Sequence, residues 1–349
     1  MTSFFALLLL TALAILLYAY LRRPYLPAET DAILDAVLAR ELPELVTGES
    51  GFAAARGSLI WYERIRPQSP AKGAILLLMG MGGDALMWPP RFVHALAEAG
   101  YEVVRYDHRD TGLSSRVDRW DRKAPYTVAD MAVDAVAVLD ALGIKQAHLI
   151  GLSLGGMVAQ EVAIQQPQRV TSLALLMTSG YIGDPELPGP TSRYFLGALL
   201  RSLPLLKYRL AGGERNLIKE AIAKATVAYG AERVDIEELA ERVLYNLRKR
   251  GGVNLRAALR HQAAISHAGS RYEGLQRVDV PALVVHGTAD ELIPVEHAQK
   301  LAATLPEARA LWLDGVGHGF PPDEERLLEH LLAHLDRAAE RRLHDNGRR

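Results

Sequence analysis

The stretch "HLIGLSLGGMVAQE", from His148 to Glu161, places one serine between small residues where a strand-forming run gives way to a helical pattern. Residues 151–155 spell G-x-S-x-G at that junction. We expect a turn too tight for side chains on either side of the serine, which holds its backbone strained and its hydroxyl exposed. A glycine-flanked serine can also be an ordinary helix N-cap. The position between strand and helix favours Ser153 as a nucleophile.

The surrounding sequence alternates short β-rich runs with helical stretches. Unbroken apolar strands separated by helices are typical of a mostly parallel sheet with helices on both faces. The sequence therefore predicts an α/β fold that presents the serine at the carboxyl edge of its sheet. A pair of strands spans residues 52–65, and further strands are predicted within residues 74–80, 102–108, 147–153, 172–180, 282–290 and 308–318.

This alternation stops in a long segment whose pattern is wholly helical, between the fourth and fifth of those later strands. An insertion of this size between two strands of one sheet predicts a helical cap over the core. The expected division of the chain is an anchor at 1–23, a linker with a short helix at 24–54, core segments at 55–180 and 275–340, the cap at 181–274, and a basic tail at 341–349.

The N-terminal run "FFALLLLTALAILLYAYL", residues 4–21, contains no charge and only Thr11 as a polar interruption. At ~1.5 Å per residue it reaches about 27 Å, which predicts a transmembrane helix that inserts into a lipid bilayer. A secretory signal peptide is the alternative, although basic residues do not precede the run and no small-x-small cleavage site follows it. Arg22 and Arg23 follow it directly, so the positive-inside tendency predicts a single-pass membrane protein with a cytoplasmic catalytic domain. Export with a signal peptide would place that domain outside.

The composition excludes several classes of function. With 349 residues, 49% of them hydrophobic, and a formal net charge of −1, the chain is long and apolar enough for a substantial globular core. Basic and acidic residues are interspersed, so we expect no nucleic-acid partner. Since there are no cysteines and the histidines lack metal-ligand spacing, we expect neither a thiolate nucleophile, nor a catalytic metal, nor a cofactor.

A serine nucleophile needs a base, and the base needs an acid that orients it. Asp290 ends "VVHGTAD" after one apolar strand, and His318 lies in "DGVGHGF" after the next strand. The chain order Ser, Asp, His is the order expected when acid and base follow the last strands of such a sheet. Asp290 could instead be a simple turn residue, with Glu291 as the acid. The sequence thus predicts a triad of Ser153, Asp290 and His318.

Ester hydrolysis also requires hydrogen-bond donors for the oxyanion of the tetrahedral intermediate. The backbone N–H of Leu154, directly after the serine, is the first expected donor. The second is expected in the turn "MGMGGDA", residues 79–85, with Met81 as the predicted donor. Gly82 is the alternative if the register differs by one residue, and the turn could also be no more than a glycine-rich loop.

These motifs resemble those of the α/β-hydrolase superfamily over nearly all of the chain after residue 55. The resemblance rests on the serine turn, "GTADELIP", "GVGH" and "RYDHRDTGLSS". Within that superfamily, "RYDHRDTG", "DAVAVLDALGI" and "AAISHAG" are similar to bacterial carboxylesterases of the anthracycline methylesterase type. The resemblance implies that Asp107, Arg109 and Asp110 hold loops together and take no part in the chemistry. Family members often carry a His-Gly pair where this chain has Met79 and Gly80.

The sequence predicts a serine esterase that cleaves a lipophilic small-molecule or lipid ester through an acyl-enzyme, tethered to the bilayer through residues 4–21. Epoxide hydrolases and haloalkane dehalogenases of this fold use an aspartate nucleophile, and Ser153 argues against them. Perhydrolase, thioesterase, lactonase and carbon–carbon hydrolase activities would use the same triad and remain alternatives. A non-catalytic, membrane-anchored binding protein is the alternative from a different class.

Overall fold

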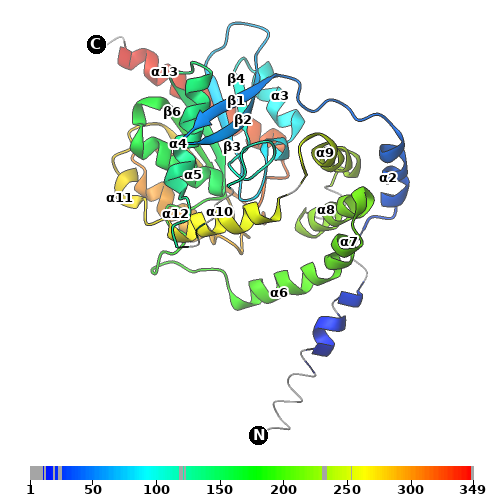
Figure 1. The fold of residues 1–349 in the computed structure, drawn as a ribbon. Helices are drawn as coiled ribbons and strands as arrows, with labels where there is room; N and C mark the ends of the chain where they lie inside the picture. The colour runs from blue at the N-terminus through cyan, green and yellow to red at the C-terminus, as the bar shows by residue number, and fades with distance from the viewer. Residues whose placement is uncertain are drawn as a thin grey trace. The chain divides into compact units, whose positions relative to one another are not determined.

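An eight-stranded sheet forms the centre of the structure, with strand order β1-β2-β4-β3-β5-β6-β7-β8 (Figure 1). Each of β3 to β8 runs parallel to its neighbours in that group, whereas β1 and β2 form an antiparallel hairpin and β2 pairs antiparallel with β4. The predicted mostly parallel α/β sheet is therefore confirmed. Its strands are β1 (Glu49–Ala55), β2 (Ser58–Ile65), β3 (Ala74–Leu78), β4 (Glu102–Tyr106), β5 (Ala147–Leu152), β6 (Val170–Leu176), β7 (Ala282–Gly287) and β8 (Ala308–Leu313).

The chain divides into two compact units in this computed structural model. The unit that holds the sheet, which we call the core unit, comprises residues 45–189 and 253–349. The other, which we call the helical unit, comprises residues 1–44 and 190–252. The structure describes residues 11, 13–18, 20–22, 26–117, 121, 123–229, 234–252 and 254–346.

Side chains of the inner strands point alternately into two apolar layers, one on each face of the sheet. On β6, Leu173 and Leu175 belong to one layer, and Ala174 and Leu176 belong to the other. Because both faces are covered, the inner strands are apolar throughout, as expected for a buried parallel sheet. The first layer is covered by α4 (Val128–Ala141), α5 (Leu154–Gln165) and α12 (Val295–Thr304), and the second by α3 (Pro90–Glu98) and α13 (Glu324–Asn346) (Figure 1).

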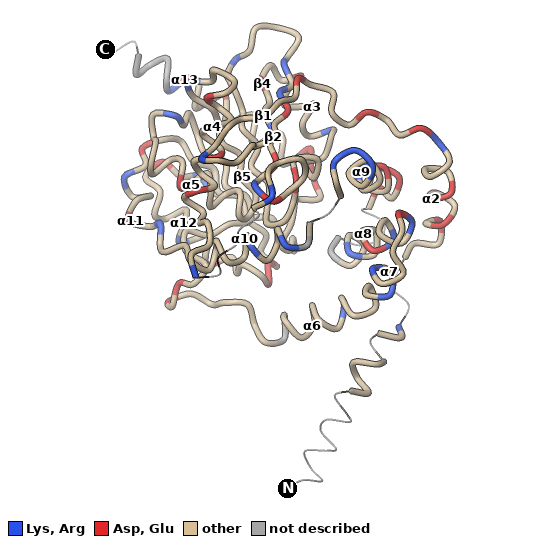
Figure 2. The backbone as a smooth tube through the Cα atoms, viewed as in Figure 1, with Lys and Arg blue, Asp and Glu red and all other residues tan. Residues whose placement is uncertain are grey.

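The helical unit has a small apolar core of its own, to which α2, α8 and α9 contribute. These helices together carry charged residues of both signs (Figure 2), and Arg215 pairs with Asp31 and Asp35. Exposed pairs of this kind add little stability, so the buried aliphatic side chains hold the unit together. Those buried residues are Leu34, Val37, Ile218, Ile222, Ile236, Ala240 and Leu244. The helices are α2 (Thr30–Ala39), α6 (Ser192–Ser202), α7 (Leu206–Ala211), α8 (Gly213–Tyr229) and α9 (Ile236–Lys249).

The helical unit differs in extent from the predicted cap at 181–274. It takes in residues 190–252 of that segment, whereas α10 (Leu255–His267) and α11 (Tyr272–Leu275) belong to the core unit. The reason lies in the contacts of α10, whose Arg260 and His261 bond to loops of the core unit. Helical periodicity identifies the apolar face of a helix but not the element on which that face packs.

Two further boundaries differ at the ends of the chain. The short helix predicted in the linker at 24–54 is α2, and it packs within the helical unit. At the other end α13 continues to Asn346, well into the predicted tail at 341–349. Within it, Arg341 pairs with Asp279 and Glu307, so at least the start of the predicted tail is bound to the core unit.

The predicted anchor at 1–23, with its bilayer segment at 4–21, falls largely on residues that the structure does not describe. Among the described residues, no helix is both long enough and apolar enough to cross a membrane. The transmembrane helix therefore stays a prediction.

A buried histidine links the stability of the core unit to pH. His334 on α13 is 5% exposed, and burial lowers its pKa to about 4. A contact with the Leu173 backbone raises the pKa but does not offset the effect of burial. Histidine in an unfolded chain has a pKa of ~6.5. Since the folded pKa is the lower one, this stability is fully present above pH ~6.5 and is lost as the pH falls toward 4.

We expect the His334→Leu variant to lose less stability than the wild type when the pH falls from 7.5 to 4.5. The shift of His334 corresponds to about 1–3 kcal/mol over that range. Urea midpoints measured at both pH values test this, with His330→Leu, at an exposed position of the same helix, as the matched control. Equal acid destabilisation of His334→Leu and wild type would contradict the assignment.

Candidate active site

Ser153 occupies a strained turn between β5 and α5. Its backbone has φ +53° and ψ −114°, a conformation that non-glycine residues rarely adopt. A Cβ atom on Gly151 would lie 2.4 Å from the Gly155 carbonyl oxygen, and one on Gly155 would lie 1.9 Å from that of Leu78. Both flanking positions therefore require glycine, as the motif predicts. Although Ser153 is at the N-cap position of α5, its side chain makes no capping hydrogen bond.

The three predicted triad residues lie together at the carboxyl edge of the sheet. The Nε2 atom of His318 is 3.1 Å from the Oγ atom of Ser153, and its Nδ1 atom is 2.7 Å from Oδ2 of Asp290. Ser153 follows β5, Asp290 follows β7 and His318 follows β8, so the parallel strands bring together residues far apart in sequence. Ser153 and His318 are partly exposed, whereas Asp290 is buried. The imidazole is placed to exchange a proton with the serine hydroxyl.

Asp290 is held as a carboxylate. Its Oδ1 atom accepts hydrogen bonds from the backbone N–H groups of Leu292 and Ile293, at 2.9 and 2.8 Å. Burial raises the pKa of Asp290, but hydrogen bonds from His286 and His318 outweigh burial and hold the pKa well below its usual value. Asp290 therefore carries a negative charge beside His318 at neutral pH. The rival acid Glu291 is exposed, and His318 bonds to Asp290.

His286 is a residue of this site that the sequence analysis missed. Its Nε2 atom lies 2.8 Å from the Ile293 carbonyl oxygen and 3.3 Å from Oδ2 of Asp290, and the side chain is fully buried. It lies inside β7, in "VVHGTAD", four residues before the aspartate. Its closeness in sequence to Asp290 was the only feature that could have indicated a place in the site, because no motif distinguishes His286 from other buried histidines.

The predicted oxyanion turn follows β3 and lies beside Ser153. The Gly83 N–H donates to the Gly80 carbonyl at 3.2 Å, which closes a turn with Met81 and Gly82 at its centre. A Cβ atom built on Gly80 would lie 3.7 Å from the Cβ atom of Ser153. The turn is therefore close enough to Ser153 for its amides to approach a bound carbonyl group.

The two predicted donor amides have no acceptor in the described part of the chain. In the described part of the chain, neither the Met81 nor the Leu154 backbone N–H donates a hydrogen bond to the protein. Leu154 is the first residue of α5, where amides lack a helical acceptor and the helix dipole is positive. Both amides are thus available to a ligand oxygen.

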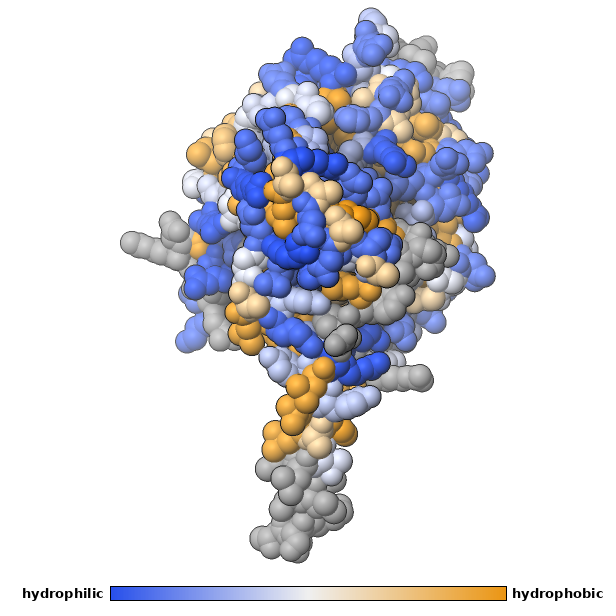
Figure 3. All heavy atoms as spheres, turned by 90° about the vertical axis from the view of Figure 1, so that its right-hand side faces the viewer, coloured by the Kyte–Doolittle hydropathy of each residue, from blue (hydrophilic) through white to orange (hydrophobic). Residues whose placement is uncertain are grey.

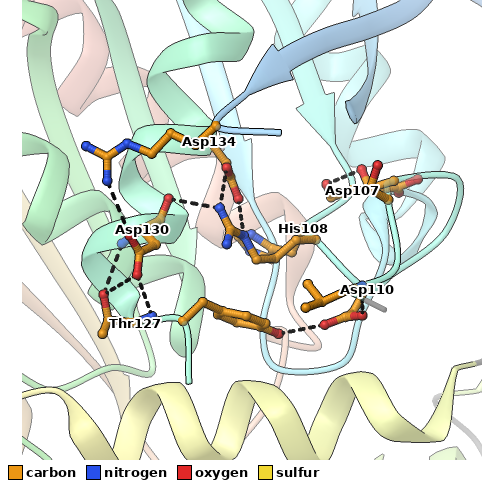
Figure 4. Close-up of polar contacts among 12 residues, drawn as sticks. Asp107, His108, Asp110, Thr127, Asp130 and Asp134 are labelled. Carbon is orange, nitrogen blue, oxygen red and sulfur yellow. Dashed lines mark hydrogen bonds and ion pairs between the residues drawn. The ribbon is translucent and has the colours of Figure 1, made fainter. Parts of the chain in front are cut away.

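Asp107 ties the end of the oxyanion turn to the 107–113 loop (Figure 4). Its Oδ1 atom accepts from the Ala85 N–H at 2.9 Å, and its Oδ2 atom accepts from the Leu113 N–H at 2.8 Å. A Cβ atom on Gly112 would lie only 2.1 Å from this carboxylate. Both oxygens of the fully buried side chain are occupied, so Asp107 joins loops, as the family resemblance implies.

Arg109 and Asp110 join further elements to the same loop (Figure 4). Arg109 forms a two-pronged ion pair with Asp134 of α4, at 2.6 and 2.7 Å. Asp110 accepts from the Tyr126 hydroxyl at 3.1 Å and pairs with Arg260 of α10 at 2.5 Å. These contacts also agree with a structural role. Among the described residues, no group of three or more His, Asp and Glu side chains is arranged to hold a metal ion.

Comparison with known proteins agrees with this architecture. Residues 73–325 match the family described as alpha/beta hydrolase fold. The rhodomycin D methylesterase DauP of Streptomyces sp. (strain C5) is 32% identical over 278 residues, which cover 75% of this chain and 89% of that protein. The predicted resemblance to methylesterases of this type is thus confirmed, and it supports carboxylic ester hydrolysis as the activity.

Solved structures show the same fold. The enol-lactonase from Burkholderia xenovorans LB400 superposes with a TM-score of 0.61 at 24% identity, covering 82% of this chain and all of that one. A bacterial membrane phospholipase A superposes with a TM-score of 0.60 at 21% identity, covering 97% of this chain and 99% of that one. The family match covers well over half of this chain, and the eight-stranded, mostly parallel sheet is the one expected for that family. This chain therefore belongs to the α/β-hydrolase family.

Proposed function

We propose that this protein is a serine hydrolase that cleaves carboxylic esters through an acyl-enzyme. The observation that carries the proposal is the position of the His318 imidazole, which bonds to both the Ser153 hydroxyl and the Asp290 carboxylate. The similarity to a methylesterase supports the same class of reaction.

In the proposed mechanism, the Oγ atom of Ser153 attacks the ester carbonyl carbon while Nε2 of His318 takes the hydroxyl proton. The carbonyl π bond opens to an oxyanion, which the backbone N–H groups of Met81 and Leu154 stabilise. Collapse of this intermediate breaks the ester C–O bond, and His318 returns the proton to the leaving alcohol. Water then attacks the carbonyl carbon of the acyl-enzyme while His318 takes its proton, and the collapse of this second intermediate releases the acid and the free serine. Asp290 orients His318 and stabilises the imidazolium that forms in each half-reaction.

The substrate proposed is a lipophilic small-molecule or lipid ester. The relative DauP is named as a methylesterase, which favours an ester whose alcohol part is small and whose acid part carries most of the recognition. Lactonase, thioesterase, perhydrolase and carbon–carbon hydrolase activities need the same three side chains and remain second candidates. A non-catalytic binding protein is the alternative from another class.

We further propose that residues 4–21 tether the protein to a lipid bilayer, with the catalytic domain in the cytoplasm. The described part of this segment presents large apolar side chains to solvent (Figure 3). Leu17 and Leu21 are 58% and 63% exposed. At its end, the Arg22 carbonyl accepts a hydrogen bond from Nζ of Lys207 of α7 at 2.6 Å. The neighbouring α6 exposes further apolar side chains, namely Phe195, Leu196 and Leu199. Apolar surface of this extent supports contact with lipid.

For the catalytic proposal, we expect the wild type to hydrolyse p-nitrophenyl esters and to react with a fluorophosphonate probe. Ser153→Ala should abolish labelling and lower kcat by about 10⁴-fold or more, because the nucleophile is lost. Asp290→Asn should lower kcat by about 10³–10⁴-fold, because the imidazolium loses its counter-charge.

Glu291→Gln is the matched control, since it changes the adjacent exposed acid and should leave kcat unchanged. A wild-type protein that neither turns over nor reacts with the probe would favour the binding protein. An active Asp290→Asn variant beside an inactive Glu291→Gln variant would move the acid to Glu291.

For the membrane proposal, we expect the full chain to co-float with phospholipid vesicles and a chain beginning at residue 24 to stay in the soluble fraction. The shorter chain should keep its hydrolysis of soluble p-nitrophenyl esters, because the triad lies in the core unit. The intact mass of the membrane fraction distinguishes a retained segment from a cleaved signal peptide. Equal flotation of both chains would contradict a tether at residues 4–21.

A further inference from the structure

A buried histidine outside the triad contacts the oxyanion turn. His261, on α10, is fully buried, and its Nδ1 atom accepts a hydrogen bond from the Gly82 N–H at 3.1 Å. Its Nε2 atom lies 3.0 Å from the Arg109 carbonyl oxygen. Because an amide can only donate, Nδ1 must be unprotonated, and the single ring proton on Nε2 is donated to Arg109. Burial lowers the pKa of His261, which is consistent with this neutral form.

The fit between α10 and the turn is close. Gly82 has φ +72°, and a Cβ atom on it would lie 3.1 Å from the Cβ atom of Ala258. Ala258 and His261 are three residues apart and therefore share one face of α10. That face both packs against Gly82 and accepts its N–H, so the position of the Met81–Gly82 peptide is fixed from outside the turn.

A second histidine holds the other end of the same turn. The Nε2 atom of His108 is 2.9 Å from the Met79 carbonyl oxygen, which fixes the Met79–Gly80 peptide. The rings of His108 and His261 meet edge to face, 5.8 Å apart. In Figure 4 the loop that carries His108 lies beside the pale yellow α10, in agreement with the bond from His261 to the Arg109 carbonyl.

The Gly80–Met81 peptide lies between these two fixed peptides. Its carbonyl accepts from the Gly83 N–H, and its own N–H, on Met81, has no acceptor in the described chain. Since the N–H and C=O of a trans peptide point in opposite directions, fixing the carbonyl also fixes the direction of the N–H. Gly82 cannot serve as the alternative donor while its N–H is bound to His261.

We propose that His261 is a positioning residue for ester hydrolysis, which holds the Gly82 N–H and thereby presents the Met81 N–H as the second oxyanion donor. The inference rests on the proposed function. It predicts a defect in kcat and little change in KM, because the oxyanion forms only in the transition state.

A pair of amide variants separates the two hydrogen bonds of His261. In His261→Asn the side-chain oxygen lies near the place of Nδ1, so it can accept from Gly82, while the bond to Arg109 is lost. In His261→Gln the side-chain nitrogen lies near the place of Nε2, so it can donate to Arg109, while Gly82 loses its acceptor. We expect His261→Asn to retain most of kcat and His261→Gln to lower kcat by about 10–100-fold, less than loss of a donor itself. His267→Gln, at an exposed position of the same helix, is the matched control.

Met81→Pro tests the donor directly, because proline has no N–H. A turn whose third residue has positive φ accepts proline at its second position. We expect Met81→Pro to lower kcat by about 10²–10³-fold. If His261 acts through Met81, His261→Gln should have little further effect in the Met81→Pro background.

The outcomes separate this inference from the proposed function. An inactive wild type, or an active Ser153→Ala variant, would contradict the proposed function itself. With an active wild type, the inference is overturned by full kcat in His261→Gln or in Met81→Pro, by equal losses in His261→Gln and His261→Asn, or by additive losses in the double variant. The Met81→Pro result decides the donor even where a His261 variant fails to fold.

Discussion

The close approach of α5 to the end of β3 constrains the rest of the site. At Gly155 the helix lies so near the Leu78 carbonyl that no side chain fits, and Ser153, two residues earlier, has the strained backbone conformation of the turn. Ser153 is kept there by its N–H bond to the Leu176 carbonyl and by the Thr178 hydroxyl, which donates to its carbonyl, both at 2.8 Å. Hydrogen bonds with β6 and with the residues that follow it therefore maintain the strained backbone of Ser153. In this conformation the hydroxyl points toward His318.

The parallel strand order converts that local turn into a reaction centre. The ends of β3, β5, β7 and β8 contribute the oxyanion turn, the serine, the aspartate and the histidine respectively. Supporting contacts come from outside the sheet, through the 107–113 loop and α10. Asp107 and His261 accept hydrogen bonds from the Ala85 and Gly82 N–H groups, which are not the predicted oxyanion donors. A turn held by these contacts is preorganised, since little reorganisation is needed when negative charge develops.

Local motifs made the serine turn, the strands and the three triad positions predictable, because each depends on neighbours in the sequence. Contacts between distant segments were not predictable in the same way. Residues 253–274 have the same helical pattern as the helices before them, yet α10 packs on the core unit. His261 lies on the buried face of α10 with Ala257 and Ala264, which signals burial but gives no indication of its bond to Gly82. His286 was missed for the same reason.

The central claim is that the acyl group is carried by Ser153. Rapid-quench mass spectrometry of the full chain, mixed with p-nitrophenyl acetate and digested, tests it most directly. The account predicts a transient gain of one acetyl group on the peptide that contains Ser153, formed in a burst before steady turnover. Acetylation at a different side chain in step with turnover, or turnover with no acylated peptide at any time, would contradict it.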